Sequence, residues 1–236
     1  AADDAAGSAV ASNLSTKARS GLQAMRNAND GISVIQTAEA ATKEVVNILD
    51  RMRELAVQSS SETLAAGERA YITNEYSELA DEVERIAQAT EFNDIALTDG
   101  TNTTLVVQVG IDGSTASEVS ITLGHLQATE LGVDTGSVDL SSQSTAQTAI
   151  TTIDTALDSV NSIRADYGAS QNRLESSVNN MTAYVEALSS AKSRIMDADY
   201  AHETAEMTRL QVMQQAGVAA LGQARSMNTS VISLLG

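Results

Sequence analysis

Proline, cysteine and tryptophan are missing from this 236-residue chain, and Phe92 is its one phenylalanine. The absence of cysteine excludes a disulfide framework and any metal site built on thiolates. The absence of proline removes the residue that most strongly interrupts helices, so very long helices are permitted. Aromatic residues make up only 3% of the chain, which excludes a core dominated by aromatic rings and leaves small and aliphatic side chains to pack it.

Basic residues are scarce as well: 14 Lys and Arg stand against 31 Asp and Glu, which gives a formal net charge of -17. Such an acidic chain is not expected to bind nucleic acid or an anionic membrane through charge. No run of about 18 apolar residues occurs, so no membrane-spanning helix is expected. The start, Ala1-Ala2-Asp3-Asp4, has neither the basic head nor the apolar run of a signal peptide. It also lacks an initiator Met, and we expect a fragment or a processed form.

Residues that could carry chemistry are few. The two histidines are His125 and His202, and the stretch from His202 to Glu206 begins like a zinc-protease motif. That motif needs a second histidine four residues on, where Glu206 stands, so no metal site is expected. No phosphate-binding glycine loop or nucleophile–base set is present either. We therefore predict a protein that is not an enzyme and needs no cofactor.

The clearest positive signal is a stripe of apolar residues between residues 150 and 188, with steps of three and four residues. Its members are Ile150, Ile153, Leu157, Val160, Tyr167, Leu174, Val178, Met181, Val185 and Leu188. Arg164 and Gln171 are the polar positions of the predicted seam, where they would fix the register of the pairing. This pattern is typical of a long helix that packs along a partner helix.

Similar reasoning along the chain predicts a mainly α protein with a small β-hairpin region in its middle. Helices are expected over about 3–60, from residue 63 or 66 to about 90, and over about 144–190, with possible bends at Gly21 and Gly31. Strands are expected at 105–109 and 119–123 around a loop at 110–117, and 124–144 is expected to be irregular. The expected division of the chain is 1–98, 99–144, 145–190 and 191–236.

The last segment, 191–236, is again helical in pattern but rich in small residues and methionine. Its apolar stripe includes Met207, Leu210, Met213, Leu221, Val231, Leu234 and Leu235. Because small residues bury little area, such a helix gains too little from packing alone to offset the entropy of ordering it. We therefore predict that it packs against other chains; the alternative is an ordinary final helix of the bundle.

Several longer motifs carry a family resemblance. In the N-terminal half these are Asp3-Asp4-Ala5-Ala6-Gly7, the runs 26–33 and 36–39, Arg51-Met52-Arg53-Glu54-Leu55-Ala56-Val57-Gln58, and the runs 84–88 and 90–93. In the C-terminal half they are the runs 164–175, 191–201, 214–217 and 231–235. Together these motifs resemble bacterial flagellin over about 1–98 and 145–236. The family's further helical segment before Asp3 is not in this sequence.

The resemblance implies an antiparallel, coiled-coil-like helical rod, capped by the hairpin, with terminal helices that pair in the core of a filament. It implies other subunits as partners, an export chaperone on the C-terminal tail, the filament cap, and export without a cleaved signal peptide to the extracellular filament. A hook–filament junction protein and a flagellin-derived cell-surface protein that binds a ligand are the alternatives. The middle, 100–144, is expected to be an exposed linker or a glycosylated display.

The resemblance also implies a surface for the vertebrate Toll-like receptor that senses flagellin. The matching residues are Arg51, Leu55, Glu75, Ile153 and Leu157. Arg51 and Leu55 are one helical turn apart and are expected to share a face. The alternative is that Arg51 makes an ion pair within the bundle while the three apolar residues belong to the seam.

Overall fold

The computed structural model describes residues 4–197 and 199–235, with side chains described as far as residue 225. Four helices dominate it: α1 (Ala5–Ser59), α2 (Ala66–Ala89), α3 (Gln143–Met196) and α4 (Tyr200–Leu235). The predicted mainly α fold is confirmed, and α3 extends beyond the expected end at residue 190. The chain forms two units, one spanning Ser15–Leu188 and one made from the two ends of the chain, up to Leu14 and from Ser189.

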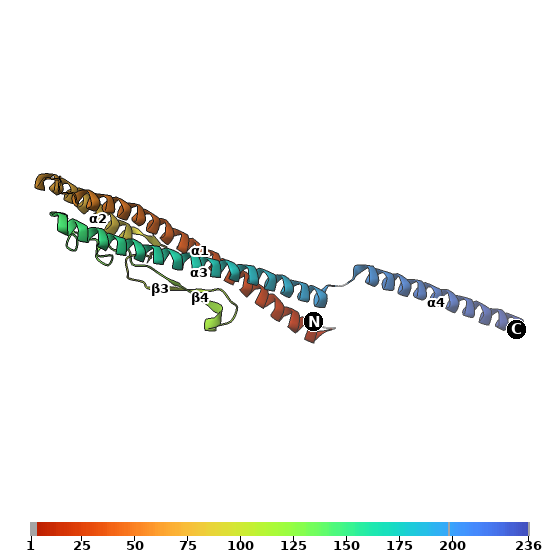
Figure 1. Ribbon diagram of the computed structural model, residues 1–236. Helices are drawn as coiled ribbons and strands as arrows, with labels where there is room; N and C mark the ends of the chain where they lie inside the picture. Colours follow the sequence, from red (N-terminus) through yellow and green to blue (C-terminus); the bar gives the residue numbers. More distant parts are fainter. Residues whose placement is uncertain (1–3, 198, 236) are drawn as a thin grey trace. The chain divides into compact units, whose positions relative to one another are not determined.

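In the larger unit, α1 and α3 lie side by side and run in opposite directions (Figure 1). A Cβ atom added to Gly21 would lie 2.6 Å from Val185, and one added to Gly31 would lie 3.3 Å from Leu174. These two glycines therefore let the helices approach closely, which is the reason for glycine inside such a long helix. No bend is needed, since α1 is continuous through both positions.

The seam of α3 differs in detail from the predicted one. The residues buried on this helix are Ala146, Ala149, Ile153, Ala156, Val160, Tyr167, Ser170 and Leu174. Ile163 packs against the core, while Arg164 and Gln171 are only half-buried, and Gln171 bonds to Glu175 on its own helix. Arg164 and Gln171 therefore lie at the edge of the seam, where Nε of Arg164 is buried, and their role in fixing the register stays a prediction. Alanine and serine fill positions between the large seam residues, and a pattern built on large apolar residues overlooks them.

The segment between the hairpin and α3 was expected to be an exposed linker, and this is also wrong. Residues 123–142 contain no helix or strand, yet they bury Leu126, Ala128, Val133, Val138 and Leu140 against α1, α2 and α3. Side chains of α1 and α2 hydrogen-bond to the backbone of this segment. Tyr76 Oη donates to the carbonyl of Val133 (3.0 Å), and Ser59 Oγ donates to that of Leu140 (2.7 Å). The carboxylate of Glu84 accepts a hydrogen bond from the backbone amide of Ala128 (3.0 Å).

Two small hairpins complete the larger unit. The predicted hairpin is confirmed, and each strand begins one residue before its expected start. It consists of β3 (Thr104–Gln108) paired antiparallel with β4 (Glu118–Thr122), and its loop contains the short 3-10 helix η1 (Thr115–Ser117). Its inner face packs on α1 and α3 through Val107, Val119 and Ile121. The sequence reading missed β1 (Glu91–Phe92) and β2 (Ile95–Ala96), whose turn places Asn93 and Asp94 at φ 51° and 63°. Asn and Asp tolerate this left-handed conformation better than most residues.

The end of α1 is closed by Arg69 rather than by a residue of the helix itself. Its guanidinium donates to the carbonyl of Ser59 (3.0 Å), the last residue of the helix, and to those of Ser61 (2.7 Å) and Leu64 (3.0 Å) in the loop that follows.

Arg69→Met keeps the length of the side chain and removes all three of these hydrogen bonds. We expect the free energy of unfolding to fall by about 1–3 kcal/mol, as for other hydrogen bonds from charged groups. Urea unfolding followed by circular dichroism measures this. Arg85→Met is the matched control, because Arg85 is 63% exposed and bonds only to Glu82, so it should lose less than about 0.5 kcal/mol. Equal losses in the two variants would contradict the capping role.

Candidate functional sites: the terminal helix and the Arg51 surface

The terminal helix α4 has its own N-terminal cap. Asp199 Oδ1 accepts hydrogen bonds from the backbone amides of Ala201 (2.9 Å) and His202 (3.2 Å), which satisfies two of the free donors at the start of the helix. A carboxylate at this end also complements the helix dipole. The start of α4 is therefore specified by a local sequence signal.

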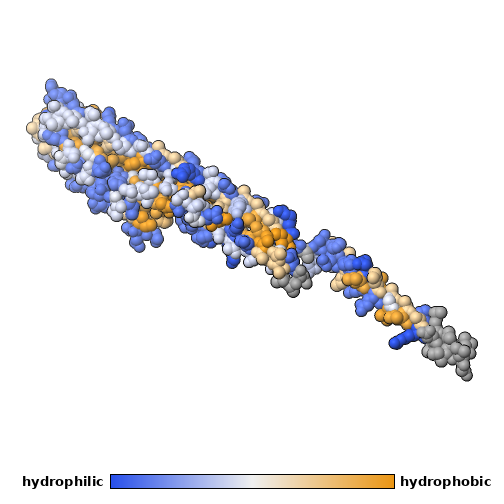
Figure 2. Space-filling view, turned by 90° about the horizontal axis from the view of Figure 1, so that it is seen from below, coloured by the Kyte–Doolittle hydropathy of each residue, from blue (hydrophilic) through white to orange (hydrophobic). Residues whose placement is uncertain are grey.

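Large apolar side chains on α4 face solvent. Met207 is 55% exposed, Leu210 52%, Met213 57% and Leu221 69%, and Val212 and Val218 are exposed too. Figure 2 shows these side chains as orange patches on the helix just before the grey C-terminal atoms. The predicted tail residues with described side chains are thus all available at the surface. The side chains of Val231, Leu234 and Leu235 lie outside the described residues.

The glycines of α4 differ from those of α1. A Cβ atom added to Gly217 or Gly222 would meet nothing within 4 Å, whereas Gly21 and Gly31 face side chains of the larger unit. Around them stand Ala216, Ala219, Ala220 and Ala224. Small exposed residues let another helix approach closely. A contiguous apolar patch at the surface of a protein commonly marks a site of interaction with another protein.

The Arg51 surface lies where α1 and α2 meet. Arg51 donates to Glu75 (2.6 Å) and to Glu54 (2.8 Å), and its side chain stays 50% exposed. The hydrogen bond to Glu75, with that to Glu54 after it, raises the pKa of the guanidinium. Nearby, Arg53 pairs with Asp154 of α3 at 2.6 Å and lowers the pKa of that carboxyl. The two ion pairs thus join α1 to α2 and to α3, on different sides of α1.

The five predicted receptor residues do not form one surface. Leu55 is 1% exposed and Ile153 is fully buried, both in the core between the three helices, while Leu157 is partly buried. Arg51 and Glu75 are exposed and in contact. Arg51 and Leu55 lie one helical turn apart, but Leu55 is covered by the core while Arg51 stays exposed. Glu54, which the sequence reading did not single out, could have been found from its i,i+3 spacing to Arg51.

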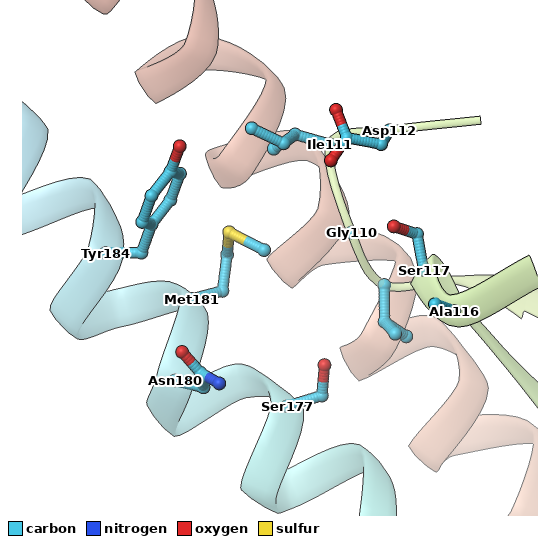
Figure 3. A pocket seen from close by; sticks show the side chains of 10 residues that line it. Gly110, Ile111, Asp112, Ala116, Ser117, Ser177, Asn180, Met181 and Tyr184 are labelled. Atoms are coloured by element: carbon cyan, nitrogen blue, oxygen red, sulfur yellow. The ribbon is translucent and has the colours of Figure 1, made fainter. Parts of the chain in front are cut away.

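Two surface cavities of the larger unit flank the β3–β4 hairpin. One of about 350 Å³ lies between the hairpin loop and α3, where Tyr184 and Met181 face Ile111 and Asp112 (Figure 3). Another of about 440 Å³ lies between α1 and the hairpins, lined by apolar residues such as Val34 and Phe92. Neither brings together an acid, a base and a nucleophile in the way that a catalytic site requires.

Two further findings concern the part of the chain that the structure describes. No group of three or more His, Asp or Glu residues there is arranged to hold a metal ion. None of its helices combines the length and the apolar character needed to cross a bilayer.

Comparison with known families then gives a direct answer. The bacterial flagellin N-terminal helical region matches residues 1–103, and the bacterial flagellin C-terminal helical region matches residues 150–235. The chain belongs to the bacterial flagellin family. A flagellin of Halalkalibacterium halodurans is 42% identical over all of this chain and 86% of its own length. A flagellar filament 33 kDa core protein of Treponema phagedenis is 38% identical, again over 100% of this chain and 86% of that protein.

Solved structures agree with this fold. The crystal structure of Bacillus cereus flagellin matches with a TM-score of 0.57 and 33% identity, over 66% of this chain and 88% of that one. A putative flagellar hook-associated protein from Vibrio parahaemolyticus reaches a TM-score of 0.68 at 15% identity, over 82% of this chain and 99% of that one. At 15% identity this second match concerns the fold alone.

Membership of the family settles the broad function. Flagellins are structural proteins that polymerise with copies of themselves into the flagellar filament, an extracellular appendage, and this chain is such a filament subunit.

Proposed function

We propose that this flagellin assembles through α4, whose apolar side chains pack against the terminal helices of neighbouring subunits in the filament. The observation that carries the proposal is the exposure of Met207, Leu210, Met213 and Leu221 on a helix that has its own N-terminal cap. Burying these side chains between subunits would recover hydrophobic free energy that the single chain does not gain. In this proposal 1–98 and 145–190 form the rod, 99–144 the hairpin and insert, and 191–236 the assembly segment.

Electron microscopy of short filament seeds incubated with the purified protein tests this proposal. A filament subunit elongates the seeds, and growth continues as long as protein is supplied. A hook–filament junction protein would bind seed ends without elongating them. A cell-surface ligand-binding protein would ignore the seeds altogether. Either of the last two outcomes would contradict assembly through α4.

Other partners follow from the same helix. We propose that the export chaperone covers the exposed apolar face of α4 before assembly, and that the filament cap places each arriving subunit at the growing end. The protein would then reach the extracellular filament without a cleaved signal peptide. The physical support is that an apolar helix face must be shielded from other copies until it meets its final partners.

We further propose that the Arg51 surface is recognised by the vertebrate flagellin-sensing Toll-like receptor. Arg51 and Glu75 supply exposed polar contacts, and the partly buried Leu157 would supply an apolar one. Leu55 and Ile153, being buried, would hold α1 and α3 in place beneath this surface. An exposed arginine with apolar neighbours is a common anchor of protein interfaces.

Arg51→Ala tests the receptor proposal. We expect the concentration needed for half-maximal activation of receptor-bearing cells to rise at least about tenfold, which corresponds to about 1.4 kcal/mol. Arg85→Ala removes another exposed arginine that pairs with a carboxylate, on α2, and should leave activation unchanged. If Arg51→Ala activates the cells as well as the parent, the receptor does not use this surface.

A further inference from the structure

The chain carries all its sulfur in seven methionines, since it has no cysteine. Their environments differ sharply. Met52 is fully buried in the core of the larger unit, whereas Met196, Met207 and Met213 are 57%, 55% and 57% exposed. Met25 and Met181 are half-buried. Susceptibility of a thioether to oxidation follows its exposure, so Met52 is the most protected of the described methionines and Met196, Met207 and Met213 are the most accessible.

We propose that Met207 and Met213 form an oxidation-sensitive site, at which conversion to methionine sulfoxide blocks packing of α4 against other subunits. This inference rests on the proposed role of α4 in assembly. The oxidant is a peroxide, and the residues would be accessible to it in the free subunit. Once they are packed between subunits, the same side chains would be shielded.

The reaction is a two-electron oxygen transfer. The thioether sulfur attacks one oxygen of hydrogen peroxide, an S–O bond forms and the O–O bond breaks. The sulfur is oxidised and the peroxide is reduced. The second peroxide oxygen leaves as hydroxide and takes the proton from the transferred oxygen, so the products are the sulfoxide and water. The side chain thereby changes from apolar to polar while the backbone stays intact.

The surroundings of Met213 favour the product. Nη1 of Arg209 lies 3.7 Å from the Met213 sulfur, while the same guanidinium is paired with Glu206 one turn earlier. An oxygen added to this sulfur would be a strong acceptor beside a ready donor. Arg209 would then hold the sulfoxide by a charge-assisted hydrogen bond. Oxidation would thus place a polar, hydrogen-bonded group on the apolar face of α4.

The effect on assembly follows from desolvation. Met207 and Met213 each lie three residues from Leu210, so they flank it on the two edges of an apolar stripe about 120° wide. Buried against apolar side chains of another subunit, the sulfoxide of Met207 would lose its hydrogen bonds to water, and that of Met213 would bring the charged Arg209 guanidinium into the contact. Two such groups within two turns would weaken the contact of every incoming subunit.

The first test is the rate of oxidation at each methionine. The free protein is treated with dilute hydrogen peroxide, and peptides are quantified by mass spectrometry over time. We expect Met207 and Met213 to oxidise at least about tenfold faster than Met52, in line with their exposure. Equal rates at Met52, Met207 and Met213 would overturn the assignment of the site.

The second test measures growth of filament seeds after peroxide treatment, with all proteins carrying Met227→Leu so that this residue cannot contribute. We expect growth of the oxidised parent to fall at least about tenfold. Relative to its own untreated growth, the double variant Met207→Leu/Met213→Leu should lose less than about twofold on peroxide treatment, because leucine cannot be oxidised. Met196, which stays oxidisable in the variant, serves as the internal control. Unchanged growth of the oxidised parent, or equal loss in the variant, would overturn the inference.

These outcomes separate the inference from the proposed function. Failure of the untreated parent to elongate seeds would contradict assembly through α4, and with it any effect of oxidation on assembly. Normal growth of the untreated parent combined with peroxide-resistant growth would contradict only the inference.

Discussion

Replacing Leu210 by aspartate is expected to abolish growth on filament seeds while leaving the helical core as stable as in the parent. Leu210 is 52% exposed in the single chain, so a carboxylate there stays in water and costs the monomer little. In the proposed filament the same position is buried between apolar helices, where an unpaired carboxylate costs several kcal/mol. We therefore expect the rate of seeded elongation, followed by electron microscopy, to fall at least about a hundredfold.

The matched control is Thr208→Asp, which adds the same charge on the other side of α4. Thr208 bonds only to the carbonyl of Thr204 on its own helix. This variant should elongate seeds within about threefold of the parent, since exposed charges interact weakly in water. Equal loss in both variants would mean that added negative charge, rather than burial of Leu210, stops assembly. Normal growth of Leu210→Asp would contradict a role for this face of α4.

The largest loss of stability is expected from Tyr167→Ala in the larger unit. Tyr167 is fully buried in α3 and packs against α1 and the β3–β4 hairpin. Its phenolic oxygen accepts a hydrogen bond from the backbone amide of Gly124 at 3.0 Å. Burial raises the pKa of this phenol, so the neutral form is held in the core. Truncation leaves a large cavity and should lower the free energy of unfolding by about 3–5 kcal/mol.

Tyr167→Phe separates packing from hydrogen bonding at the same position. It keeps the ring and leaves the Gly124 amide without its acceptor, so a smaller loss of about 1–2 kcal/mol is expected. Equilibrium unfolding in urea measures both variants. A loss in Tyr167→Ala no greater than that in Tyr167→Phe would contradict the account of Tyr167 as the residue that joins α3, α1 and the hairpin.

The long helices were predictable because their signals are local and repeated. Without proline, and with apolar residues at steps of three and four, α1 and α3 have little alternative to helix. The hairpin was predictable from two β-rich runs around a Gly- and Asp-containing loop. The family motifs at residues 51–58 and 164–175 lie on these same helices, so the helical pattern and the family resemblance both predicted a long helical rod.

The details of packing were less predictable. Ala146, Ala149, Ala156 and Ser170 occupy the seam of α3, and nothing in the sequence distinguishes a buried alanine from an exposed one. The burial of residues 123–142 was missed because this segment has no periodicity. Its apolar side chains reach the core only through the path of an irregular backbone, held by side chains such as Tyr76 and Glu84 that are distant in sequence.

The predicted receptor residues illustrate the same limit. One turn along α1 separates Arg51 from Leu55, and helical spacing alone placed them together. The position of α2 and α3 decides that Leu55 is covered while Arg51 reaches Glu75. For the tail, the structure shows that Met207, Leu210 and Met213 are exposed, and their packing against other subunits stays a prediction.

Amide hydrogen exchange, compared between the free protein and the assembled filament, tests the central claim most directly. Peptides covering 200–225 should exchange quickly in the free chain, since their helix lacks packed apolar contacts, and should gain at least about a hundredfold protection in the filament. Peptides of α1 around the buried Leu49 and Met52 should be protected in both states. Strong protection of 200–225 in the free chain, or none in the filament, would contradict assembly through α4.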